Sequence, residues 1–175
     1  MKEKSIAHNF VMNFILTVSN IVFPLITFPY ASRILLADGM GKIAFSASVI
    51  TYTNIIVQLG IPNYGIRECA KCRDDKEKLS KTVQELMIIQ GIMLGVCIVS
   101  LGVMLFTIPK FEAYRTLIII YGIGMVLSTL GINWFFQAIE EYGFITSRNI
   151  IVRLTCVVLM FFLVRDKKDI VNYAL

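Results

Sequence analysis

The sequence predicts an all-α integral membrane protein with about five transmembrane helices and the start of a sixth. Hydrophobic residues make up 57% of its 175 residues, and the mean hydropathy is +0.73. A soluble domain averages about 45–50% apolar residues. The excess is gathered in five long runs, and the charged residues lie mostly between them. Run 86–108 has 23 residues and no Asp, Glu, Lys or Arg; as a helix it would rise about 34 Å, enough to cross a hydrocarbon core of roughly 30 Å.

Each run is long enough for one crossing, which disfavours a soluble helical protein and a cleavable signal peptide. In the first run, Pro24 and Pro29 lack a backbone N–H and should bend the helix. The third stops before Pro109, and its Gly91 and Gly95 form a GxxxG pattern typical of close helix packing. The predicted spans are 6–35, 43–61, 86–108, 116–139 and 144–164, and a sixth begins near residue 170.

The basic residues predict the orientation. Six of the 17 Lys and Arg residues lie in loop 66–82 between the second and third spans. A cytoplasmic N-terminus places this loop in the cytoplasm, with nine basic residues inside and seven outside. The loop is predicted to form a short amphipathic helix at the membrane surface, where its basic side chains would meet anionic lipid head groups. We therefore expect a multi-pass protein with its N-terminus in the cytoplasm.

Catalytic and metal-binding motifs are missing from the sequence, which disfavours an enzyme. There is one histidine, no GxSxG and no Walker A pattern. Cys69 and Cys72 form a CxxC, which is half of a zinc site, and His8 is far away in sequence. We interpret this pair as incidental and expect neither metal nor cofactor. The net charge of +5 is not arranged as a basic patch with interleaved aromatic residues, so nucleic acid is not an expected partner.

Polar side chains form stripes on three of the predicted spans. Amides that face lipid would leave donors and acceptors unpaired, so each stripe should face protein or water. Hydrogen bonding between helices would explain any single stripe, whereas three stripes favour a shared hydrophilic cavity. At about 100° per residue, the residues of the first stripe lie within about 40° of one another and those of the second within about 60°. The stripes are Asn9, Asn13 and Asn20; Thr51, Asn54 and Gln58; and Thr129, Asn133 and Gln137.

Arg153 is the charged residue nearest the centre of a predicted span. It lies nine residues past Phe144, or about 13 Å into the fifth span. A central arginine costs at least about 2.5 kcal/mol and is retained where it faces a bundle interior or a cavity. Arg148 and Asn149 lie on the same helix, nearer its start. The functional interpretation is an anion site, since a guanidinium binds phosphate oxygens bidentately; the structural one is a snorkelling or ion-paired arginine, with Glu85 as a possible partner.

Several segments resemble bacterial polysaccharide flippases of the Wzx type, which export O-antigen and capsule precursors. The resemblance covers nearly the whole chain and is carried by NFILTVSNIVFPLITFPYASRIL, GKIAFSASVI, GIPNYGIRECAKCRDDKEKLSK, INWFFQAIEEYGFITSRNIIVRL and FLVRDKKDIVNYAL. It implies the fold of the multidrug-exporter-like (MATE-like) superfamily, in which two pseudo-symmetric lobes of helices enclose a cavity. The chain would supply most of one lobe, and we expect a fragment that is not active alone and lacks the C-terminal lobe.

The resemblance also implies a function. Such flippases move undecaprenyl-pyrophosphate-linked oligosaccharide across the plasma membrane, with membrane lipids and polysaccharide assembly proteins as further partners. The expected substrate-binding residues are the two arginines and the amides of the stripes: Arg153, Arg148, Asn149, Asn9, Asn13, Asn20, Asn54, Gln58, Asn133 and Gln137. The alternatives are a cation-coupled drug exporter of the same superfamily, which would need acidic residues within its spans, and a membrane scaffold subunit without a cavity. Run 86–108 is expected to serve packing and lipid contact and not to contact substrate.

Overall fold

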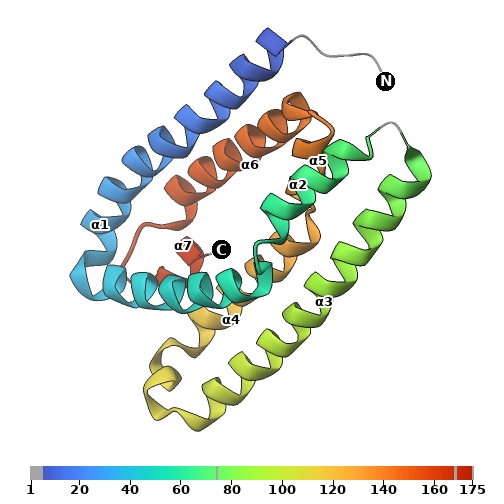
Figure 1. Cartoon of the computed structure of the whole chain (residues 1–175). Helices are drawn as coiled ribbons and strands as arrows, with labels where there is room; N and C mark the ends of the chain where they lie inside the picture. The colour runs from blue at the N-terminus through green and yellow to red at the C-terminus, as the bar shows by residue number, and fades with distance from the viewer. Residues whose placement is uncertain (1–5, 74, 168, 175) are drawn as a thin grey trace.

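The computed structural model describes residues 6–73, 75–167 and 169–174, and within these ranges the chain forms helices and no strands. Helix α1 (Ile6–Gln58) leads into α2 (Ile61–Lys71), and α3 (Lys76–Thr107) into the short 3-10 helix η1 (Pro109–Tyr114). Helices α4 (Arg115–Leu130), α5 (Asn133–Ala138), α6 (Tyr142–Leu163) and α7 (Ile170–Ala174) follow. The first half of α1 lies beside α6, and α2 lies beside α5 (Figure 1). The predicted all-α class is confirmed.

Four helical stretches of the described chain are long and apolar enough to cross a membrane, whereas the sequence predicted five. The count differs because the first two predicted spans belong to one helix, α1, which bends at Leu36. At 1.5 Å per residue its 53 residues would extend about 80 Å if straight, far more than one crossing needs. The bend therefore gives two arms, each long enough for a crossing.

The break in the helical backbone of α1 lies beyond the two prolines. Pro24 and Pro29 lie within continuous helix, and Leu36 is the residue with non-helical angles, φ 56° and ψ −177°. That conformation is almost restricted to glycine, so Leu36 holds local strain. The packing around the bend explains why it persists: Ala31, Leu35 and Ile43 on either side of it are buried in one cluster with Met160 and Val164 of the α6 end.

The predicted fourth span and the predicted loop helix also differ from the structure. Span 116–139 is interrupted at Gly131 and Ile132, where Ile132 has a φ of 42°, and it continues as the short helix α5. The amphipathic helix expected within 66–82 begins earlier, at Ile61, and buries Ile61, Gly65 and Cys69, one residue per turn. Residues 76–82 of the loop are the charged first part of α3, which is why α3 is longer than the apolar run 86–108.

The chain crosses back and forth between two ends. At one end, Arg73 of the α2–α3 turn forms an ion pair with Glu140 of the α5–α6 turn, with 3.2 Å between nitrogen and oxygen. The Thr146 hydroxyl donates a hydrogen bond of 3.0 Å to the Met12 carbonyl and ties the start of α1 to the start of α6. At the other end, the rings of Phe45 and Tyr114 lie 4.6 Å apart between the second arm of α1 and η1.

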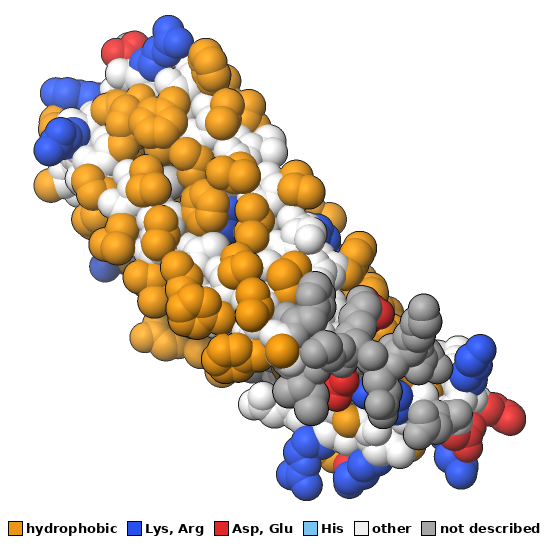
Figure 2. Space-filling view, turned by 90° about the horizontal axis from the view of Figure 1, so that it is seen from above, with side chains coloured by type: hydrophobic (Ala, Val, Ile, Leu, Met, Phe, Trp, Pro, Cys, Tyr) orange, Lys and Arg blue, Asp and Glu red, His pale blue; other side chains and the backbone are white. Residues whose placement is uncertain are grey.

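Side chains of different chemistry separate along the molecule. Seen from above, hydrophobic side chains cover the middle of the visible face, and Lys, Arg, Asp and Glu gather at its two ends (Figure 2). The exposed hydrophobic residues include Phe10 and Leu25 on α1, Ile92 and Val99 on α3, and Phe162 on α6. This apolar band between two charged ends is the surface expected of a protein whose solvent is lipid.

Candidate functional site

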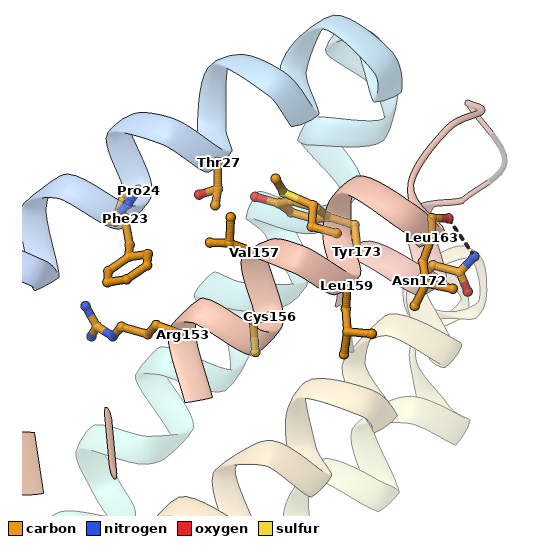
Figure 3. A pocket seen from close by; sticks show the side chains of 11 residues that line it. Phe23, Pro24, Thr27, Arg153, Cys156, Val157, Leu159, Leu163, Asn172 and Tyr173 are labelled. Atoms are coloured by element: carbon orange, nitrogen blue, oxygen red, sulfur yellow. Dashed lines mark hydrogen bonds between the residues drawn. The ribbon is translucent and has the colours of Figure 1, made fainter. Parts of the chain in front are cut away.

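A cavity of about 400 Å³ lies between the first arm of α1, the middle and end of α6, and α7. Its walls are largely apolar, and Arg153 is the charged side chain among the described residues that line it. Figure 3 shows the guanidinium of Arg153 extending from α6 towards the ring of Phe23 on α1. Other residues of the wall are Pro24, Cys156, Leu159, Leu163 and Tyr173.

Arg153 is held at the middle of its helix. It lies eleven residues after Tyr142, or about 16 Å along the axis of α6. Its guanidinium carbon is 5.8 Å from the centroid of the Phe23 ring, within the range of a cation–π contact. Glu85 is exposed on α3, and no ion pair joins it or any other described carboxylate to Arg153. The half-buried charge therefore rests against an aromatic face with its N–H groups available to a ligand.

Arg148 lies elsewhere. Its guanidinium donates a hydrogen bond to the Asn133 side-chain oxygen on α5, and its central carbon is 5.7 Å from the Phe144 ring centroid. Five residues of helix turn the direction of a side chain by about 140°. Arg148 and Arg153 consequently point to opposite sides of α6, and the structure does not bring them together.

A second cavity, of about 240 Å³, lies where α1 and α4 end and α2 and α5 begin. It brings together Gln58, Asn133 and Gln137, which the sequence placed on two different stripes. It also includes Gln90 and Trp134, which the sequence analysis missed. Gln90 is the one amide within run 86–108, and it faces the protein interior with a relative exposure of 6%. Its isolation in a charge-free run was the signal that could have singled it out.

The remaining predicted site residues line neither of these two cavities. Asn13 and Asn20 are exposed on the first arm of α1, on the surface of the chain. Asn9 and Asn54 are half-buried, and their side-chain oxygens are buried without a hydrogen-bond partner among the described residues. The Asn149 amide donates a hydrogen bond of 2.9 Å to the Ile145 carbonyl of its own helix. Two members of the first stripe, Asn13 and Asn20, therefore face outwards, whereas the side-chain oxygen of Asn9 is buried.

The cysteine pair and the GxxxG pattern have no role in these cavities. Cys69 is buried in the cluster between α2, α3 and α5, and the described residues contain no group of three or more metal-binding side chains. Gly91 and Gly95 are exposed on α3, and a Cβ added to either would meet no atom within 4 Å. The expectation of close helix packing at this GxxxG is therefore wrong for contacts among the described residues.

Residues 6–175, nearly the whole chain, match the model of a family described as polysaccharide biosynthesis protein. The chain belongs to this family. The resemblance found in the sequence is thus confirmed at the level of the family, and the apolar helices agree with a multi-pass membrane protein.

Two curated relatives extend the comparison. A protein of Escherichia coli (strain K12) named "Putative O-antigen transporter" is 25% identical over 166 residues, which are 95% of this chain and 40% of the relative. A protein of Shigella dysenteriae with the same name is 28% identical over 165 residues, 93% of this chain and 41% of the relative. The chain spans about 40% of the length of these relatives. No solved structure matches it significantly.

Proposed function

We propose that the chain forms part of an exporter that moves lipid-linked oligosaccharide, carried on undecaprenyl pyrophosphate, across the bacterial plasma membrane. The family and the names of the two relatives support export of a polysaccharide precursor. In this proposal the N-terminus and the end that holds Arg73 and Glu140 face the cytoplasm. The chain contributes one side of a hydrophilic cavity, and rocking of two lobes around that cavity opens it to each side in turn.

The observation that carries the proposal is the position of Arg153. A charge halfway along a membrane helix is energetically costly. Such a charge is retained where it has a function or is paired with a counter-charge. None of the described carboxylates forms an ion pair with Arg153, so the counter-charge is supplied by the substrate. A pyrophosphate offers oxygens that a guanidinium binds in two parallel hydrogen bonds.

The apolar part of the same cavity suits the lipid part of the substrate. Leu159 and Leu163 follow Arg153 along α6 at roughly two and three turns, and both are exposed. A polyprenyl chain beside them would remain in contact with the bilayer while its phosphate is held at Arg153. This arrangement separates the charged and hydrocarbon parts of one ligand along a single helix.

The exposed amides of α1 suit the sugars. Asn13 and Asn20 would lose their hydrogen bonds if they faced hydrocarbon, so their face should border water or protein. We place this face on the hydrophilic cavity, where the amides hydrogen-bond sugar hydroxyls. Asn9, Asn54 and Asn149 remain proposed members of the same polar lining.

The proposal is tested by replacing Arg153 in the transporter that contains this chain, in cells without a flippase of their own. Arg153→Gln should reduce surface glycan at least tenfold, which corresponds to about 1.4 kcal/mol of interaction free energy. Arg153→Lys keeps the positive charge but cannot bind bidentately, so it should retain only part of the export. The measurement is immunoblotting of surface polysaccharide, with membrane insertion checked on the same cells.

Arg165→Gln is the matched control, since Arg165 is exposed just past the end of α6. It should export normally. Normal export by an inserted Arg153→Gln protein would contradict the anion site and would favour a scaffold role. Loss of drug efflux in place of glycan export would favour a cation-coupled exporter.

A further inference from the structure

The cavity at the break between α1 and α2 has the features of a built binding site. Gln90 and Trp134, two of its lining residues, are buried, with relative exposures of 6% and 4%. The Trp134 ring nitrogen is buried and has no hydrogen-bond acceptor among the described residues. The benzo edge of the same ring lies against Gly65 of α2. A buried donor without an acceptor is unfavourable, so this indole lies where the polar groups of the chain are not fully satisfied.

The chemistry of the lining selects a neutral ligand. The four amides of Gln58, Gln90, Asn133 and Gln137 can both donate and accept hydrogen bonds, and no charged side chain is among the lining residues. The Asn133 oxygen already accepts a hydrogen bond from Arg148, which leaves its NH₂ group as a donor. A guanidinium at the border of the cavity also disfavours a metal cation there. At about 240 Å³, the cavity is smaller than the pockets that hold drug-sized ligands.

We infer that this cavity binds a single sugar ring of the transported oligosaccharide, with the four amides bonded to its hydroxyls and the Trp134 side chain beside it. This inference rests on the proposed function and adds a second ligand site to it. Sugar hydroxyls donate and accept, as the amides do, and the apolar C–H face of a pyranose suits an indole ring. The site lies on the side of α6 to which Arg148 points, away from Arg153, so sugar and phosphate are bound at separate places.

The location of the cavity agrees with capture of a sugar near one membrane surface. Gln90 lies one helical turn inside the start of the charge-free run at Leu86. The charged α2–α3 turn and the ion pair between Arg73 and Glu140 lie towards the same end of the molecule. A sugar could therefore reach the amides from that end without crossing the apolar middle of the chain.

Trp134 provides the test, because it is the only tryptophan of the 175 residues. The purified chain in lipid nanodiscs is titrated with the methyl glycosides of glucose, N-acetylglucosamine and rhamnose, and the tryptophan emission is recorded. We expect a saturable change with at least one of them, half-complete in the millimolar range. Gln90→Leu should weaken binding at least tenfold, and Gln84→Leu, on the exposed face of the same helix, should not change it.

Folding is checked by circular dichroism, and Gln58→Leu at a half-buried position serves as the second variant if Gln90→Leu does not fold. A saturable response to NaCl, KCl or phosphate without any response to the three glycosides would overturn the inference. Absence of any saturable response would overturn it as well. Arg153→Gln separates the two proposals: it should lose export and keep the sugar response, whereas Gln90→Leu should lose the sugar response.

Discussion

At the scale of single residues, identical side chains on one helix acquire different roles from their partners. The Arg148 guanidinium donates a hydrogen bond to Asn133, whereas the Arg153 guanidinium makes a cation–π contact with Phe23 beside a cavity. The sequence placed both in one anion site because they are close along the chain. Their angular separation of about 140° on α6 was available from the spacing, but which side of α6 meets a cavity depends on α1 and α5.

Asp75 is a residue whose role is local and therefore accessible from sequence. Its carboxylate accepts a hydrogen bond of 3.2 Å from the Lys78 backbone N–H and caps the start of α3. The backbone and side chain of Lys78 hold the pKa of Asp75 below its ordinary value. A lowered pKa means that the cap stabilises the folded state above the ordinary pKa and that this contribution is lost as the pH falls through the folded pKa.

We predict that Asp75→Ala increases amide hydrogen exchange in the first turn of α3 at pH 7, measured by mass spectrometry in nanodiscs. In the natural chain the same amides should lose protection below about pH 4. Asp75→Asn keeps a capping oxygen without a titrating proton, so its protection should not change with pH in this window. A pH response retained by Asp75→Asn would assign the effect to another group.

At the scale of elements, the short helices α2 and α5 behave as a packed pair. Each begins after residues with positive φ, Leu59 and Gly60 before α2 and Ile132 before α5. They meet where Gly65 lies under the Trp134 ring, so closely that a Cβ at Gly65 would be 2.6 Å from the ring atom Cε3. The absence of a side chain at Gly65 thus sets the distance between the two helices.

Gly65→Ala should consequently destabilise the protein, by about 1–3 kcal/mol as for other overpacked sites, and shift the Trp134 emission. Thermal unfolding followed by circular dichroism, together with fluorescence, measures both effects. Gly91→Ala is the control: it lies within α3, its added Cβ meets no atom within 4 Å, and alanine favours helix by about 1 kcal/mol. Equal stability of the two variants would show that α2 and α5 can move apart without a loss of unfolding free energy.

At the scale of the whole molecule, the chain alternates between two charged ends separated by an apolar band. Helix α3 connects them, since its 32 residues extend about 48 Å. Basic residues of the α2–α3 region gather at one end, and the positive-inside rule predicts that this end faces the cytoplasm.

The orientation can be measured by labelling single cysteines in a variant whose four natural cysteines are replaced by serine. Lys78→Cys, at the start of α3, should react with a membrane-impermeant maleimide only after the membrane is permeabilised. Lys110→Cys, in η1 at the other end, should react in intact spheroplasts. The reverse pattern would mean that the N-terminus faces away from the cytoplasm.

The class of the protein and the approximate position of its helices could be predicted from the sequence, because hydropathy and helical period are local along the chain. The family was indicated by the resemblance of several segments and is confirmed by the family match. The sequence also identified Gln58, Asn133, Gln137 and Arg153 as polar groups that lipid cannot satisfy.

Which of these groups meet depends on the tertiary structure. The fold breaks the helix of α1 at Leu36, leaves Asn13 and Asn20 exposed, and brings Gln90 and Trp134 to the amides of other helices. The reason is that a side chain's partners depend on the rotation and packing of helices distant in sequence. Hydropathy along one helix carries no information about that packing.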